Sequence, residues 1–160
     1  ADSRSQLKVV SATTQEASGL PDGKTFVYAL GGLQSDFVEI AEVNAGGLLS
    51  SFNRTEDMQR SRQGYYATIA NNNLLSLCGQ GGSVSSTAEK GEICGVNGGG
   101  RNCGRPEYIS KWSSLGGTGL SACINPTGVA ARGFLYLIGG GDANESISTK
   151  VDVSLLGGTP

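Results

Sequence analysis

A two-part phrase that recurs three times constrains the fold of this chain more than any other feature of its sequence. The first part is an apolar run that ends in glycine, at residues 26–32 (FVYALGG), 74–79 (LLSLCG) and 134–140 (FLYLIGG). The second part comes later in each copy, at residues 39–47 (EIAEVNAGG), 92–100 (EICGVNGGG) and, more loosely, 150–158 (KVDVSLLGG). Two phrases that recur in the same order at this spacing form an internal repeat, which is typical of propellers, solenoids and arrays.

The composition favours short strands joined by tight turns. Glycine accounts for 26 of the 160 residues, only 16% of residues are charged, and the net charge is −2. Apolar runs between glycines are typical of strands, and no window longer than about two turns shows the period of a helix. The sequence therefore predicts an all-β protein. The near-neutral charge argues against nucleic-acid binding, and no run reaches the ~18 apolar residues of a membrane span.

Each repeat holds about four short strands, which is the make-up of a propeller blade. We expect one domain, residues 1–160, with blade units at about 1–47, 48–100 and 101–160 and with strands shared at the termini. Residues 5–10 are expected to be a fourth strand and residues 148–156 a third strand. In the last unit the expected strands are 120–124 and 133–138, joined by a turn near 125–128.

Several of these segments resemble those of one repeat family. The phrases FVYALGG and FLYLIGG, the Arg60-Ser61-Arg62 ahead of GYYATIANNNLLSL, and hairpins of the form VxxVNxGG are similar to kelch-type β-propeller proteins. The middle unit carries Gly79-Gln80 where the other two carry Gly-Gly. The resemblance spans essentially the whole chain and implies degenerate kelch repeats in about three blades.

Three blades are fewer than the four to eight of a typical closed ring, and the edges of unfinished blades invite pairing with another chain. We therefore expect part of a larger or oligomeric propeller. Its partners would be other copies of this chain or the remainder of a longer one.

The four cysteines are an even number without zinc-ligand spacing, which favours disulfides and a compartment outside the cytosol. Cys94 and Cys103 stand symmetrically about Gly98-Gly99, where opposed side chains of a hairpin come within reach of a bond. We predict this disulfide, with two free thiols as the alternative. Cys78 and Cys123 fall in adjacent blades, and they form either a bridge between blades or two buried, inert thiols.

Two kinds of surface feature are candidates for modification or binding. Asn53 and Asn144 begin glycosylation sequons in segments expected to be loops or strand ends. Arg62 adjoins Tyr65 and Tyr66, and such a cation–aromatic group could contact a sugar or a peptide. Ordinary strand packing is the simpler explanation of the two tyrosines.

The chain contains no histidine, which excludes a Ser-His-Asp triad, a Cys-His pair and a histidine-ligated metal. We expect that the protein is not an enzyme and that it binds no metal and no cofactor. The expected function is that of a secreted, non-catalytic β-propeller module that binds protein or carbohydrate, or of a structural subunit of an extracellular assembly; the cell surface and the periplasm fit as well. The resemblance leaves one alternative, the scaffold of an extracellular oxidase or glycan-active enzyme whose catalytic residues lie outside this chain.

Overall fold

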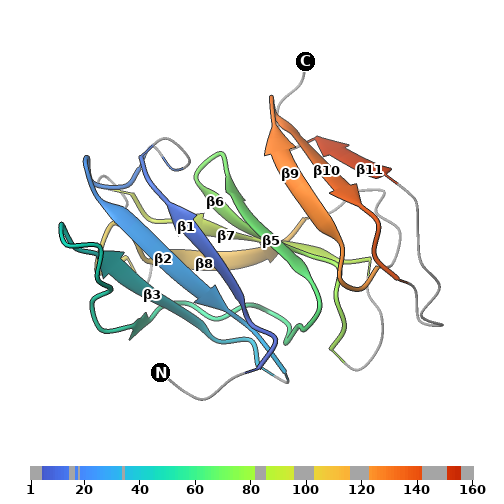
Figure 1. Cartoon of the computed structure of the whole chain (residues 1–160), viewed down its shortest axis with the longest axis horizontal. Coiled ribbons are helices and arrows are strands. Elements are labelled where there is room, and N and C mark those ends of the chain that lie inside the picture. The colour runs from blue at the N-terminus through green and yellow to red at the C-terminus, as the bar shows by residue number, and fades with distance from the viewer. Residues whose placement is uncertain are drawn as a thin grey trace.

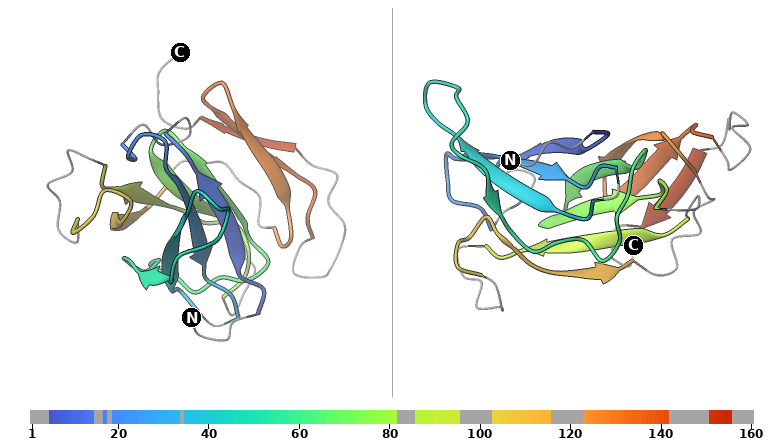
Figure 2. Two further views of the ribbon diagram at one scale, coloured as in Figure 1. Left: turned by 60° about the vertical axis from the view of Figure 1, so that its left-hand side comes forward. Right: turned by 90° about the horizontal axis from the view of Figure 1, so that it is seen from below.

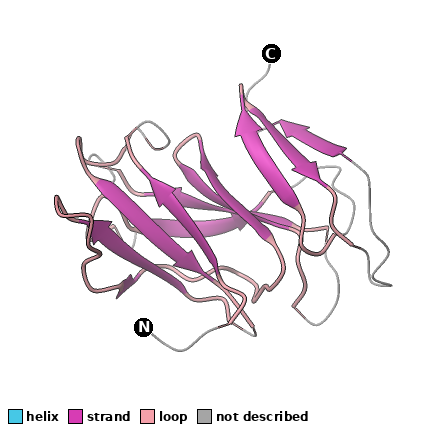
Figure 3. Cartoon of the chain, viewed as in Figure 1, coloured by secondary structure: helices cyan, strands magenta, loops and turns pink. Residues whose placement is uncertain are grey.

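The computed structural model describes residues 5–14, 17, 19–33, 35–81, 86–95, 103–115 and 123–141, together with the backbone of 151–155. Within these ranges every regular element is a β-strand (Figure 3). The same ranges contain no helix of the length and apolar character that a membrane crossing needs. The prediction of an all-β protein is confirmed.

The strands form three antiparallel sheets, and within each sheet the strands that are consecutive in sequence pair with one another. The first sheet holds β1 (Lys8–Ala12), β2 (Thr25–Leu30), β3 (Val38–Val43) and β4 (Asn53–Arg54). The second holds β5 (Tyr66–Ala70), β6 (Asn73–Leu77), β7 (Ala88–Ile93) and β8 (Ile109–Ser114). The third holds β9 (Thr127–Ala131), β10 (Phe134–Ile138) and β11 (Val151–Leu155).

The three sheets are arranged in chain order across the molecule (Figure 1, Figure 2). β5 is central, because it contacts β1 on one side and β9 on the other. One apolar core lies between the first and second sheets and includes Tyr28, Tyr65 and Trp112. A second core, around Leu77 and Leu135, lies between the second and third sheets. The second sheet is therefore covered on both faces.

Strand pairing shows which positions of the three sheets correspond. The last residue of each second strand pairs with the first residue of the strand before it: Leu30 with Lys8, Leu77 with Tyr66, and Ile138 with Thr127. The three recurring apolar runs thus occupy equivalent strands, as expected. After each of these strands come two residues with positive φ, namely Gly31-Gly32, Cys78-Gly79 and Gly139-Gly140.

The N-terminal strand does not have the position that the sequence predicted. β1 is the first strand of its sheet, not a fourth strand shared with a neighbour, and it pairs along its whole length with β2. The long connection 13–24 conceals this pairing, because the corresponding turns are only 71–72 and 132–133. The sheets span 8–54, 66–114 and 127–155, which differ from the expected blade units 1–47, 48–100 and 101–160. β11 is the third strand of its sheet, as expected.

The second recurring phrase of the sequence also does not align structurally equivalent residues of the first and second sheets. Val38 and Ala88 both open a third strand, and they pair with Leu30 and Leu77 at equivalent places. Glu39 therefore corresponds in structure to Glu89, whereas the recurring phrase aligns Glu39 with Glu92. The cause is a longer connection between the second and third strands in the second sheet, 78–87 as against 31–37.

In the third sheet, β9 begins at Thr127, inside the segment 125–128 that was expected to be a turn. Gly128 lies inside this strand, where an added Cβ would meet the Tyr136 carbonyl at 2.6 Å and Cε1 of Tyr66 at 3.1 Å. The glycine therefore serves a close approach of neighbouring strands and sheets instead of a turn. Most of the expected strand 120–124 lies outside the described residues.

Candidate functional site

Arg62, a predicted ligand contact, is only 2% exposed and lies against Glu89, which is 1% exposed. Its Nη2 is 2.8 Å from Oε1 of Glu89. The two terminal nitrogens also donate to the carbonyl of Cys78 and to the carbonyl and hydroxyl of Thr87. Oε2 of Glu89 accepts the N–H of Gln59 at 2.8 Å. The prediction for Arg62 is wrong, because its guanidinium ties the segment before β5 to β6 and β7 of the same sheet.

The two tyrosines beside Arg62 face different cores. Tyr65 is fully buried, and its hydroxyl donates to the Leu30 carbonyl at 2.6 Å. Tyr66 is half-buried and packs between the second and third sheets. Tyr65 belongs to the core between the first and second sheets and Tyr66 packs against the other core, so the predicted group does not form one binding surface. Strand packing accounts for both tyrosines.

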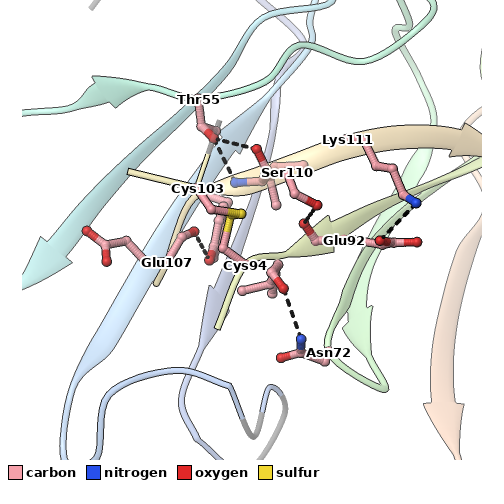
Figure 4. The surroundings of a disulfide bond; sticks show 11 residues. Thr55, Asn72, Glu92, Cys94, Cys103, Glu107, Ser110 and Lys111 are labelled. Carbon is pink, nitrogen blue, oxygen red and sulfur yellow. Dashed lines mark hydrogen bonds and ion pairs between the residues drawn. A yellow bond between two sulfur atoms is a disulfide. The ribbon is translucent and has the colours of Figure 1, made fainter. Parts of the chain in front are cut away.

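The predicted Cys94–Cys103 disulfide is present, with Cα atoms 5.5 Å apart (Figure 4). It lies just beyond the end of β7 and closes part of the connection to β8. The N–H of Cys94 pairs with the Tyr108 carbonyl at 2.8 Å. The two cysteines are therefore not opposed on a hairpin ladder, as the symmetry about Gly98-Gly99 had indicated; the bond joins a strand end to a loop.

The second disulfide, Cys78–Cys123, joins the end of β6 to the segment before β9. Of the two interpretations left open by the sequence, the bridge between adjacent sheets is the one found. Backbone hydrogen bonds reinforce these junctions. The Gly32 N–H donates to the Arg62 carbonyl at 3.0 Å, and at the next junction the Gly79 N–H donates to the Cys123 carbonyl at 2.8 Å. At both junctions, the second residue of the positive-φ pair thus holds the start of the next sheet.

One of the two glycosylation candidates falls within the described residues. Asn53 is exposed in β4, at the outer edge of the first sheet. The hydroxyl of Thr55, the third residue of its sequon, accepts the N–H of Ile109 at 2.7 Å (Figure 4). Position 144 lies outside the described residues. Asn53 stays an exposed candidate whose sequon threonine joins the first and second sheets.

A depression of about 390 Å³ lies where the segments that lead into β1, β5 and β9 meet. Gln6, Gly64 and Asn125 occupy corresponding positions there, each two residues before a first strand, and all three have positive φ. Sequence reasoning missed this site because its residues come from three repeats. We call it the corner depression, and its lining residues are Gln6, Leu7, Lys8, Gln63, Gly64, Gln80, Ile124 and Asn125.

The third sheet has the same apolar face that is buried in the first sheet, but in the third sheet this face is partly exposed. On β2, Phe26, Tyr28 and Leu30 face the second sheet and are at most 2% exposed. The corresponding residues of β10 include Phe134 at 36% and Ile138 at 45% exposure, so this strand is buried on only one face. Neighbouring Val129 is 51% exposed. We call this surface the open face; it consists of Val129, Phe134, Tyr136 and Ile138.

The titratable groups within the described residues point to structural roles. No group of three His, Cys, Asp or Glu side chains that could hold a metal occurs among them. Burial raises the pKa of Tyr28, and the nearby Glu107 carboxylate raises it further. The Tyr28 hydroxyl donates to the Glu107 carbonyl at 2.7 Å. Tyr28 therefore links the first sheet to the second in its protonated form.

No protein-family model matches the chain, and no curated protein matches it either.

Proposed function

We propose that the chain forms three blades of an extracellular, non-catalytic, kelch-type β-propeller that functions by association with a further sheet. The observation that carries this proposal is the open face. Phe134, Tyr136 and Ile138 repeat the Phe-x-Tyr-x-Leu pattern of β2, which in the first sheet is covered by the next sheet along the chain. Two disulfides are compatible with an extracellular location.

The surface that we propose as the cover of the open face is the outer side of the first sheet, at the other end of the molecule (Figure 1). In the second and third sheets, Ala67 and Gly128 lie on the side that packs against the preceding sheet. Val9 occupies the corresponding position in the first sheet and is 59% exposed. The outer side of the first sheet can therefore cover the open face of a second copy, and two copies would complete a six-bladed ring. In a longer chain, the next repeat would supply the same cover.

This association is tested by sedimentation velocity on the 160-residue chain at increasing concentration. Burying an apolar side chain of this size is worth about 1.5–3 kcal/mol, whereas an aspartate must be desolvated. Ile138→Asp and Val9→Asp should each abolish self-association. A mixture of the two variants should associate again, because the intact open face of one variant meets the intact outer face of the other.

The control is Leu48→Asp, which changes an apolar side chain that is 70% exposed and lies in the connection from β3 to β4. This variant should associate as the unchanged chain does. A chain that remains a 16.3 kDa monomer throughout the micromolar range would refute self-association. Association that survives both aspartate substitutions would show that the open face is not the contact.

A further inference from the structure

We propose that the corner depression binds a sugar unit that carries a carboxylate. Its volume of about 390 Å³ falls within the roughly 300–1,000 Å³ of small-molecule sites. Segments from all three sheets contribute to it, and each enters through a residue in the left-handed region: Gln6 (φ 57°), Gly64 (φ 60°) and Asn125 (φ 53°). Such backbone conformations persist where the surrounding structure holds them, so the three entering segments have a defined backbone path at the depression.

The lining has the chemistry that hydroxyl groups require. Four of its side chains are amides, namely Gln6, Gln63, Gln80 and Asn125. An amide donates from its nitrogen and accepts at its oxygen, as a sugar hydroxyl both donates and accepts. Among the described residues of the lining, Lys8 is the only charged one, and none carries a carboxylate. The site therefore suits a hydroxyl-rich ligand with one negative charge and does not suit a cation.

Gln63 provides an independent indication that a ligand donor is missing. Among the described residues, its side-chain oxygen Oε1 is buried and has no hydrogen-bond partner. Its backbone is held in place, because Gln63 and Gln80 exchange both backbone hydrogen bonds, at 3.0 and 2.9 Å. Oε1 is enclosed in this structure, so a ligand hydroxyl would reach it only after the Gln63 side chain turns toward the depression that it lines. A buried amide oxygen without a donor is costly, and a ligand hydroxyl would supply the donor.

A peptide is the less suitable occupant. Peptides that add to a sheet need unpaired backbone groups along a strand. Here the backbone is already used, since Gln63 pairs with Gln80 and Ile124 pairs with Gly141 in the same arrangement. The available hydrogen-bonding groups of the lining are mainly side-chain amides, which favours the sugar.

The test is an NMR titration of the ¹⁵N-labelled chain with galacturonate and with galactose as its uncharged counterpart. Both sugars should shift the side-chain amide signals of Gln63, Gln80 and Asn125. Galacturonate should bind about two- to fivefold more tightly, as expected for one solvent-exposed ion pair. Lys8→Gln should abolish this preference. Lys24→Gln removes the same charge from an exposed pair with Glu42 and should leave the preference unchanged.

Two further variants separate binding from folding. Gln63→Leu should weaken both sugars by about tenfold while leaving the signals of the second sheet in place. Asn125→Gly removes an amide but keeps a residue that tolerates positive φ, so it tests the site if the first variant does not fold. Shifts centred elsewhere, no shifts at millimolar sugar, or unchanged affinity in the variants would overturn the proposal. The depression is formed by a single chain, so these outcomes do not depend on self-association.

Discussion

Replacing Glu89 by glutamine should destabilise the chain more than removing a charge from any of its exposed ion pairs. The substitution keeps the shape of the side chain and removes the carboxylate that contacts the buried Arg62 guanidinium. Removing one partner of a buried ion pair costs about 3–5 kcal/mol, because the other charge remains desolvated. A typical domain is stable by only about 5–15 kcal/mol, so this loss is a large part of the total.

Urea unfolding with the disulfides intact measures this loss. With a typical slope of about 2 kcal/mol per molar urea, the midpoint should fall by about 2 M in Glu89→Gln. The matched control is Glu92→Gln on the same strand, which weakens an exposed ion pair with Lys111 at 3.4 Å. Exposed pairs contribute about 0.2–1 kcal/mol, so the control should move the midpoint by less than about 0.5 M.

The reasoning is refuted if the two glutamine variants lose similar stability. A double variant tests the cause more closely. Arg62→Met with Glu89→Leu removes both charges, so it should be more stable than Glu89→Gln alone. It should not regain the full stability of the unchanged chain, because the Cys78 carbonyl and the Gln59 N–H lose the partners that these two side chains supply. A double variant no better than Glu89→Gln would mean that buried charge is not the cause.

Three other substitutions have expected outcomes that the contacts set. Tyr28→Phe leaves the Glu107 carbonyl without its donor and should cost about 1 kcal/mol in urea unfolding. The pKa of Tyr28 is raised in the folded state, so only the unfolded state releases the hydroxyl proton as the pH passes about 10. The stability of the unchanged chain should therefore fall above that pH, and it should fall less steeply in Tyr28→Phe. Gly91→Ala places a Cβ 2.8 Å from Cε2 of Trp112 and should lower the free energy of unfolding by about 1–3 kcal/mol, measured by the fluorescence of this single tryptophan. Gly104→Ala is the control and should leave the stability unchanged, because no atom lies within 4 Å of the added Cβ. Replacing both cysteines of the 78–123 bridge by alanine should lower the free energy of unfolding by about 4 kcal/mol, and replacing those of the 94–103 bridge by about 3 kcal/mol. The first loss is larger because that bridge spans 45 residues and the other spans 9. If the variant without the 94–103 bridge has the lower melting temperature, the chain-entropy account is contradicted.

The parts of the fold that could be predicted are those encoded in short local patterns. The second strands β2, β6 and β10 are short, largely apolar segments followed by glycine or cysteine, so their place and equivalence could be read from the sequence. The position of β11 in the third sheet could be read from the same repeat. β1 could not be placed, because a connection of residues 13–24 separates it from its partner and the composition of a strand does not reveal what it pairs with.

The candidate sites depend on contacts between repeats, and no single stretch of sequence contains them. The corner depression combines residues that precede three different strands. The open face could be anticipated only as an uncovered blade, since its exposure depends on whether another sheet packs against the third one. Arg62 and Tyr65 were candidates for a ligand contact because they are a charged and an aromatic residue close together in sequence, but both are buried in the protein interior.

Cys78 shows why the middle repeat looks degenerate. The turn after each second strand requires two successive residues with positive φ, and the other two sheets meet this requirement with glycine. A left-handed conformation costs a non-glycine residue about 1–2 kcal/mol. Cys78 adopts it with φ 63° while its N–H donates to Thr87, its carbonyl accepts from Arg62, and its sulfur bonds to Cys123. Each of these partners belongs to the tertiary structure, so the sequence shows only Gly79-Gln80 where the turn is really Cys78-Gly79. The repeat departs from its pattern at the point where contacts with Thr87, Arg62 and Cys123 hold a cysteine in the backbone conformation that glycine adopts in the other two sheets.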